Sequence, residues 1–472
     1  MMRLLLCMIL YLVGVIQAAP TTNATTTSEY FEAPSFTNRT LSSIISSSVL
    51  TLFACVYTAI HPNIPSPEDS PFYILRRRLG IMIVALVVPE LVVVWAMRQW
   101  TSARKVTEDF EESGYFNVPR PQKQSENREL AEVPAEQLED HDRARLLDAP
   151  AEASTFKKLF QAYFSNQSED YAWTQTHSFF LLMGGFMLYV DGEPYITLEP
   201  HEILNLIREG CIDAPTLTAK QIGDKSKGNV ISKGLVILQV TWFILQLITR
   251  AIYHLETTQL ETGTLAFAVL NFLTYALWWN KPLDVQCPYP VYWKSTESKL
   301  EDHINVVTYD DEEDVISAII VPILELTSSF VYRHRLRVPT FDGSLGARNK
   351  WILVFAGILI ATTFGGIHCI AWFFTFPTNL EQVLWRISAV AITCTPCLEY
   401  LSFNFIFGDK ITIKPEIIRQ IIYMLSIVTT VTFGLLYIVG RVMLVVLMFT
   451  TLRHLPLDAY TTVSWISLVP HL

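Results

Sequence analysis

The hydrophobic and polar positions of this chain separate into long apolar runs and charged stretches between them. A helix needs about 20 mostly apolar residues to cross the hydrocarbon core, where unpaired backbone groups are too costly. Runs that meet or approach this length are Leu41–Ile60, Leu79–Met97, Gly234–Ile252, Leu260–Trp279, Ile352–Phe374, Val383–Phe407 and a last one from Ile421 to Val439 and beyond. The pattern predicts an all-α polytopic membrane protein with about seven or eight transmembrane helices.

Two shorter apolar segments have two readings each. Residues 177–190, "HSFFLLMGGFMLYV", lead into Asp191–Gly192, a strong hairpin-turn signal, so they form either a hairpin or a short membrane segment. Residues 315–331 contain Pro322 and Glu325 and are about one turn too short for a span. We expect this second segment to be amphipathic or re-entrant.

The distribution of Lys and Arg predicts which loops are cytoplasmic. With residues 20–40 outside, the first span brings Arg76–Arg78 inside, as the positive-inside rule expects, and the second returns the chain outside at Met97. A crossing by residues 177–190 then places most later Lys and Arg inside, so the rule favours it over a soluble hairpin. This assignment places Arg98, Arg104 and Lys105 outside, where the positive-inside rule does not expect them.

The N-terminus has the features of a secretory signal. Arg3, an apolar run and the small residues Ala18–Ala19 predict a signal peptide over residues 1–19, with an uncleaved anchor as the alternative. The segment that follows is then extracytoplasmic. Acceptor sequons predict glycosylation at Asn23, Asn38 and Asn166.

Composition divides the rest of the chain into segments. We expect a glycosylated segment over 20–40, a first helix pair over 41–97 and a hydrophilic, largely disordered loop over 98–172. Residues 173–233 combine the hairpin-like or membrane segment with a small helical module. The remainder is predicted as a helical pair over 234–279, a Pro-rich, aromatic and charged loop over 280–351, and C-terminal helices and tail over 352–472.

Five ionisable residues interrupt the apolar runs. A charged side chain in the bilayer centre costs at least about 2.5 kcal/mol, so such residues face inward and pair. Pro89 and Pro396 each precede a carboxylate and free a backbone carbonyl, which a cation or proton site could use. The alternative is that the charges only fix helix register. The predicted polar core consists of Glu90, His368, Arg386, Glu399 and Arg441.

Other chemistry is not indicated. A net charge of −10 gives no reason to expect nucleic-acid binding, and the sequence contains no G-x-S-x-G, Walker A or H-E-x-x-H motif. Cys394-x-x-Cys397 lies in an apolar run and is interpreted as packing rather than as a metal or redox pair. We therefore expect no cofactor, no metal and no enzymatic activity, although an enzyme with an unfamiliar motif stays open.

Several stretches resemble a family of uncharacterised multi-pass membrane proteins from filamentous and mushroom-forming fungi. They include "WTQTHSFFLLMGGFMLYVDGEP", "DKSKGNVISKGLVILQVTWFILQ", "WWNKPLDVQCPYPVYWK" and "SWISLVPHL". The resemblance implies a fungal origin and no activity or site. We expect passage of a small solute through the polar core, in the plasma membrane or a secretory-pathway membrane. The alternative is a non-catalytic sensor or scaffold that binds a protein partner through residues 98–232.

Overall fold

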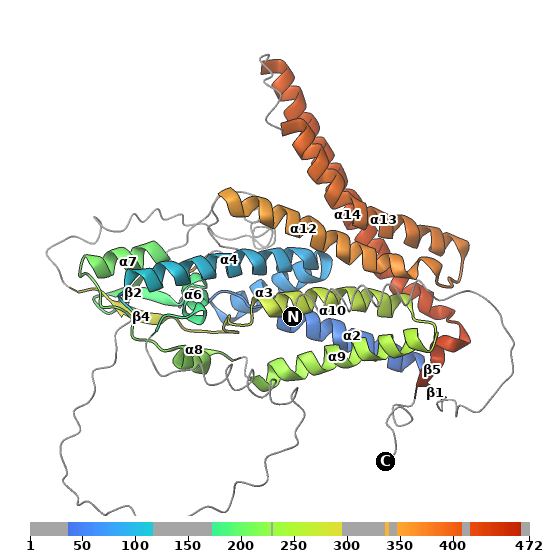
Figure 1. The fold of residues 1–472 in the computed structure, drawn as a ribbon, viewed down its shortest axis with the longest axis horizontal. Helices are drawn as coiled ribbons and strands as arrows, with labels where there is room; N and C mark the ends of the chain where they lie inside the picture. The colour runs from blue at the N-terminus through green and yellow to red at the C-terminus, as the bar shows by residue number, and fades with distance from the viewer. Residues whose placement is uncertain are drawn as a thin grey trace, which may run out of the picture.

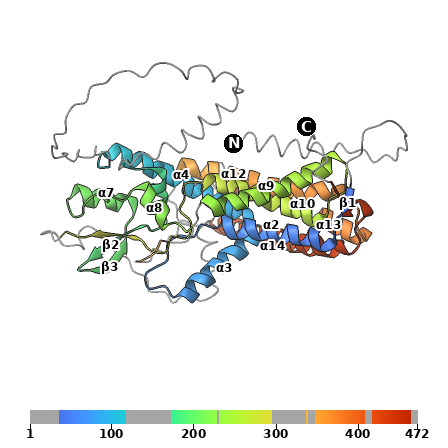
Figure 2. The same ribbon diagram turned by 90° about the horizontal axis from the view of Figure 1, so that it is seen from below.

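A bundle of long helices separates two smaller structures in this protein (Figures 1 and 2). The computed structural model describes residues 36–116, 172–227, 230–294, 336–338, 347–407 and 416–463. One end of the bundle carries a small mixed α/β unit, here called the module, and the other a two-stranded ribbon. The chain is mostly helical, as the sequence predicts.

Five helices of the described chain are long and apolar enough to cross a membrane. They occupy predicted runs, and the last begins earlier than the sequence indicated and continues past Val439, as expected. A further helix, α13 (Asn379–Phe407), covers the predicted run 383–407 and contains Pro396. The five are α2 (Leu41–Ala59), α9 (Val230–Ile252), α10 (Gln259–Leu277), α12 (Ala347–His368) and α14 (Glu416–Thr450).

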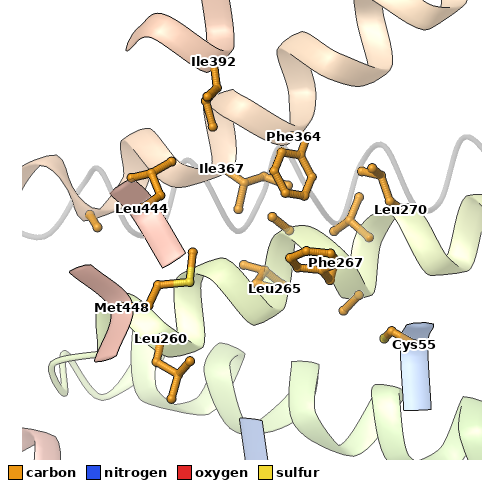
Figure 3. Packing of buried hydrophobic residues seen from close by; sticks show 14 of the residues in the cluster. Cys55, Leu260, Leu265, Phe267, Leu270, Phe364, Ile367, Ile392, Leu444 and Met448 are labelled. Atoms are coloured by element: carbon orange, nitrogen blue, oxygen red, sulfur yellow. The ribbon is translucent and has the colours of Figure 1, made fainter. Parts of the chain in front are cut away.

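Helix α10 forms the centre of the bundle. Its span is 78% buried, against 28–33% for the other four candidate spans, because neighbouring helices pack around it. Phe267 of α10 packs edge-to-face on Phe364 of α12 at a centroid distance of 5.5 Å (Figure 3). Leu444 and Met448 of α14 belong to the same core. The outer helices present large apolar side chains outward, as lipid contact requires.

The predicted run 79–97 does not form one continuous helix, because the chain breaks at Val88. Two helices, α3 (Pro71–Val87) and α4 (Pro89–Ser113), meet there at an angle of 112°. Figure 2 shows α3 leaving the bundle obliquely, whereas α4 continues along it to the module.

Contacts from both α3 and α4 reach residues that follow α10 at the module end. Arg78 at the middle of α3 forms an ion pair of 3.4 Å with Asp284, beyond the end of α10. Gln99 of α4 accepts a hydrogen bond of 2.8 Å from Lys281, which also follows α10. Glu90 precedes Gln99 by about 14 Å along the helix, roughly half of the hydrocarbon thickness. The bent pair is therefore either a broken span or a re-entrant loop.

Residues 98–116 lie beside the module. They are mainly helical, and Thr107 of α4 is 2.7 Å from Ser178 of the module. Arg98, Arg104 and Lys105 thus lie at the same end as Arg76–Arg78. The positive-inside rule accounts for all of them once α4 returns to the side from which α3 came.

The module has its own hydrophobic core and a three-stranded sheet in the order β3-β2-β4. The sheet pairs β2 antiparallel to β3 and parallel to β4. Asp191 and Gly192 take φ of 51° and 91° in the predicted turn. The elements are α6 (Gln175–Leu182), β2 (Phe186–Val190), β3 (Glu193–Thr197), α7 (Pro200–Arg208), α8 (Ala219–Lys225) and β4 (Tyr289–Tyr292).

The favoured membrane crossing by residues 177–190 is therefore wrong, and the hairpin reading is the correct one. Helix α6 has 8 residues and ends in a turn before β2, so it is far too short to span. The charge argument failed because it assumed that the second apolar run crosses. The segment 315–331 lies outside the described residues, as do residues 1–35 with Asn23, and Asn166.

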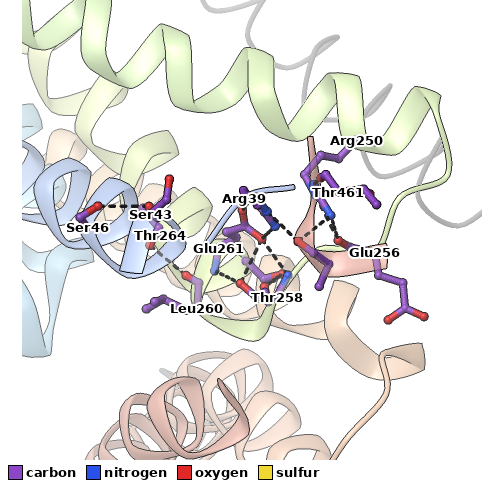
Figure 4. A network of polar contacts seen from close by, with 12 residues as sticks. Arg39, Ser43, Ser46, Arg250, Glu256, Thr258, Leu260, Glu261, Thr264 and Thr461 are labelled. Carbon is purple, nitrogen blue, oxygen red and sulfur yellow. Dashed lines mark hydrogen bonds and ion pairs between the residues drawn. The ribbon is translucent and has the colours of Figure 1, made fainter. Parts of the chain in front are cut away.

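The ribbon joins the two ends of the described chain. Strand β1 (Phe36–Asn38), which contains Asn38, pairs antiparallel with β5 (Thr461–Val463). Arg39 donates to Glu261 of α10 at 2.6 Å, and Arg250 of α9 donates to the Thr461 carbonyl at 2.6 Å (Figure 4). These bonds tie both chain ends to the α9–α10 connection, on the side of the bundle opposite the module.

Candidate functional site

The site begins at the break between α3 and α4. Proline has no N–H and its ring disfavours a helical residue before it, so Val88 takes φ −137° and ψ 67°. The last α3 bond runs from the Val88 N–H to the Val84 carbonyl at 2.7 Å. The carbonyls of Leu86 and Val87 are left without intrahelical donors.

Arg441 of α14 supplies donors to these carbonyls. Its Nε donates to the Val87 carbonyl at 2.9 Å and its Nη2 to that of Leu86 at 3.4 Å. The guanidinium carbon lies 4.0 Å from the ring centroid of Phe364 and 5.7 Å from that of Phe267. Arg441 thus connects the α3 C-terminus to the aromatic centre of the bundle.

Glu90 lies in the first turn of α4, beside this arginine. It is 5% exposed, and neither carboxylate oxygen has a hydrogen-bond partner among the described residues. The α4 N-terminus and the electrostatic attraction of Arg441 favour its charge, but the two side chains form no ion pair within 4.0 Å. A buried carboxylate without hydrogen bonds is costly, so its presence here points to function rather than to stability.

His368 completes the group from α12. Its Nδ1 is 2.9 Å from the Phe364 carbonyl, and its ring centroid is 4.8 Å from that of Phe364. Its own carbonyl accepts a bond of 3.1 Å from the indole of Trp385. Arg441 also interacts electrostatically with His368. We call Glu90, His368 and Arg441 the polar centre.

A small cavity adjoins the break. Asn271 of α10 lines it with a buried Oδ1 that has no hydrogen-bond partner in the described chain. A water molecule needs such polar partners to occupy a cavity of this kind. The full lining consists of Cys55, Val56, Ala85, Pro89, Val92, Phe267, Leu270, Asn271 and Thr274.

Comparison with known proteins gives a family but no activity. A family of unknown function, DUF8562, matches residues 5–146, 157–319 and 344–472. The chain belongs to this family. Neither the curated proteins nor the solved structures gave a match. The DUF8562 assignment confirms membership of an uncharacterised family, as the sequence suggested, and leaves the polar centre as the main functional clue.

The structure brings three of the five predicted polar residues together. The Glu90–Arg441 pairing is one of those expected, and His368 joins it. Arg386 lies elsewhere, where its Nη2 donates to the Trp372 carbonyl at 2.9 Å and its guanidinium stacks on the Trp372 ring. Glu399 is half-buried on α13 beyond Pro396, and no contact places it in the polar centre.

The cysteine pair of this DUF8562 chain shows two separate environments. Cys394 is exposed, whereas the Cys397 sulfur is 3.8 Å from the hydroxyl of Thr362. Both thiols are free. Among the described residues no cluster of His, Cys, Asp or Glu suits a metal ion.

Sequence reasoning missed Lys281, a buried basic side chain outside the polar centre. Its Nζ donates to the His61 carbonyl at 2.6 Å and to Gln99 at 2.8 Å, and it lies 4.9 and 4.6 Å from the rings of Trp95 and Trp278. Burial lowers the pKa of this ammonium well below its usual range, and the charge of Arg77 lowers it further. The signal in the sequence was a lysine that follows an apolar run and the pair Trp278–Trp279.

Proposed function

We propose that this membrane protein passes a small solute across the bilayer, with the polar centre as the gate and Glu90 as the group that changes charge. The observation that carries the proposal is Glu90 itself. Its carboxylate lies buried and without hydrogen bonds among the described residues, at the break of a bent helix pair that we interpret as re-entrant. Non-helical backbone at membrane depth occurs where it is buried in protein or lines a water-filled cavity, and broken helices commonly form solute sites.

The contacts suggest how the gate works. Arg441 occupies the Leu86 and Val87 carbonyls, which would otherwise attract a cation. Protonation of Glu90 removes the negative charge that attracts Arg441. Arg441 can then leave the carbonyls, which opens the break toward the cavity at Asn271. The proton is therefore the first ion to test, alone or coupled to a solute.

The test is proton flux into vesicles that contain the purified full-length protein. A trapped pH-sensitive dye reports the flux after a potassium diffusion potential is imposed. We expect Glu90→Gln to abolish the protein-dependent flux, because a neutral amide cannot exchange a proton.

Glu399→Gln is the matched control, since it makes the same chemical change on α13 outside the polar centre. It should retain flux, although the sequence alone assigned Glu399 to the same path. Equal flux in wild type and Glu90→Gln, with both folded, would contradict the gate.

A second candidate is a non-catalytic sensor or scaffold. It is favoured by the module, which has a hydrophobic core of its own at one end of the bundle. Under this function, charge reversal at the exposed tip, Asp191→Lys with Glu193→Lys, would change cross-linking to a partner and leave proton flux unaltered. Substitutions in the polar centre would lower only stability. Neither candidate requires catalysis, so we propose a non-enzymatic role.

Cellular placement belongs to the same proposal. The signal-like residues 1–19 and the sequons support a plasma-membrane or secretory-pathway location. The sequence resemblance supports a source among filamentous or mushroom-forming fungi. Asn38 lies on the ribbon side, which the positive-inside rule makes extracytoplasmic. Endoglycosidase treatment of the expressed protein tests this assignment through a mobility shift that Asn38→Gln reduces.

A further inference from the structure

The small cavity beside the α3–α4 break has two polar side chains in its wall. Asn271 and Thr274 of α10 line it, together with Pro89 at the start of α4. The exposed fractions of the two polar residues are only 6% and 2%. Because polar groups buried in an apolar wall are costly unless they are hydrogen-bonded, this wall favours a ligand that forms hydrogen bonds.

Both side chains can still accept a hydrogen bond. The Oδ1 atom of Asn271 has no hydrogen-bond partner among the described residues. The Thr274 hydroxyl donates to the Leu270 carbonyl at 3.0 Å, so its oxygen keeps lone pairs that can accept. A water molecule between the two side chains can therefore donate one hydrogen bond to each of them.

The size of the cavity restricts the ligand. The cavity has about 20 Å³ of room for the centre of a water molecule, and one water needs about 10–15 Å³. One water molecule therefore fits, and a larger solute does not. A hard cation such as Mg²⁺ or Ca²⁺ takes about six or more oxygen ligands, which two polar side chains do not supply.

The cavity lies nearer the module than the ribbon. Asn271 is six residues, or about 9 Å of helix, from Leu277 at the module end of α10. It is twelve residues, or about 18 Å, from Gln259 at the ribbon end. Trp278 follows Thr274 by one turn, and its buried indole N–H has no partner in the part of the chain that the structure describes. Polar groups on this face of α10 thus continue from the cavity toward the module.

The cavity also adjoins the polar centre. Ala85 of α3 and Pro89 of α4 line it from the two sides of the break. Glu90, the residue after Pro89, is the buried carboxylate without hydrogen bonds among the described residues. A change at the break therefore alters the contact between the cavity and this carboxylate.

We propose that the cavity holds one water molecule, bound by Asn271 and Thr274, which delivers protons from the module side to Glu90. The proposal rests on the proposed function and deepens it by naming the proton itself as the solute. In each transfer the bound water gives one proton to the Glu90 carboxylate and takes one from water on the module side. The bound water is thereby regenerated, and Glu90 gains one proton.

Radiolytic footprinting of the full-length protein in detergent tests for the water without a flux measurement. A short X-ray pulse splits water into hydroxyl radicals, which oxidise adjacent side chains, and mass spectrometry locates the products. Cys55 lines the cavity, whereas Cys211 is equally buried in the core of the module and serves as the internal control. We expect oxidation of Cys55 above that of Cys211. Combining Asn271→Leu with Thr274→Val removes both hydrogen bonds to the water and should lower Cys55 oxidation by about 10-fold or more.

Proton flux in the vesicle assay used for Glu90 tests the route. Thr274→Val keeps the shape of the side chain but removes the hydroxyl, and should lower the flux by roughly 3- to 10-fold. Thr264→Val is the matched control, because Thr264 is also buried on α10 and donates to the Leu260 carbonyl in the same way, but lies toward the ribbon. It should retain the flux. Asn271→Ser keeps a group that can bind the water and should also retain flux, which covers the case in which Asn271→Leu fails to fold.

Three results would overturn the proposal. One is oxidation of Cys55 no higher than that of Cys211 in the wild type, which would show that the cavity holds no water. Another is equal flux in Thr274→Val and Thr264→Val while Glu90→Gln abolishes it, which would remove this route and leave the gate in place. The third is flux that Glu90→Gln does not change, which would refute the gate and delivery to Glu90 together.

Discussion

Replacing Arg441 with methionine removes a charge from the centre of the bundle and leaves Glu90 behind. The guanidinium donates to the Val87 carbonyl at 2.9 Å and lies 4.0 Å from the Phe364 ring. A hydrogen bond from a charged group contributes about 1.5–3 kcal/mol and a desolvated cation–π contact about 2 kcal/mol. Breaking one side of a buried pair typically costs about 3–5 kcal/mol. We therefore expect Arg441→Met to lower the free energy of unfolding by about 4 kcal/mol.

The contribution of Glu90 to this loss follows from geometry. No ion pair within 4.0 Å joins Glu90 to Arg441. Two unit charges 4 Å apart interact by about 4 kcal/mol at an effective dielectric constant of about 20. Because Glu90 and Arg441 are further apart than this, their interaction energy is smaller than about 4 kcal/mol. Neutralising Glu90 in the methionine background should restore about 2 kcal/mol.

A double-mutant cycle of Arg441→Met and Glu90→Gln measures this coupling. The full-length proteins are unfolded in mixed micelles by increasing the mole fraction of dodecyl sulfate, with tryptophan fluorescence as the signal. The double variant should be more stable than Arg441→Met alone. Simple additivity of the two losses would show that Glu90 and Arg441 do not act as a pair, and would remove the physical basis of the gate.

Three further predictions concern other parts of the fold. Lys281→Met leaves two buried acceptors without their donor and should lower the free energy of unfolding by about 2 kcal/mol in the same assay. Lys294→Met is the control, because it breaks only an exposed ion pair with Asp213, and it should change the free energy of unfolding by less than about 0.5 kcal/mol. Burial lowers the pKa of His177, so the folded module holds this histidine neutral. The folded module is therefore fully stabilised above about pH 6.5. Its free energy of unfolding falls as the pH drops below that value, by at most about 1.4 kcal/mol per pH unit. Hydrogen exchange of the α6 amides should show this loss in the wild type, and His177→Gln should remove the pH dependence. Finally, a membrane-impermeant maleimide should label exposed Cys287 and an engineered Leu457→Cys from opposite sides of sealed vesicles, with Cys287→Ser as the background. Labelling of both from one side would contradict the placement of the module and the ribbon on opposite sides of the membrane.

The sequence by itself determined that the chain is helical and membrane-bound, and where most of its long helices lie. Burial of about 20 apolar residues and the backbone requirement for internal hydrogen bonds act locally, so runs such as Gly234–Ile252 are recognisable without a partner. The turn at Asp191–Gly192 was readable for the same reason, because its positive φ values favour those residue types. Glu90 was identified as unusual from its apolar neighbours alone.

Only the tertiary structure decided which of these features meet. An apolar run states that a segment is buried, but not whether it crosses the bilayer or turns back within it. Pro89 permits either a kinked span or a break, and the 112° angle depends on Arg441, some 350 residues later, being available to bond the α3 carbonyls. The same long-range packing separates Arg386 and Glu399 from the polar centre and buries Lys281 among tryptophans from two helices. Contacts between residues distant in sequence leave no periodic signal, and for that reason the polar centre could be suspected from the sequence but not assembled from it.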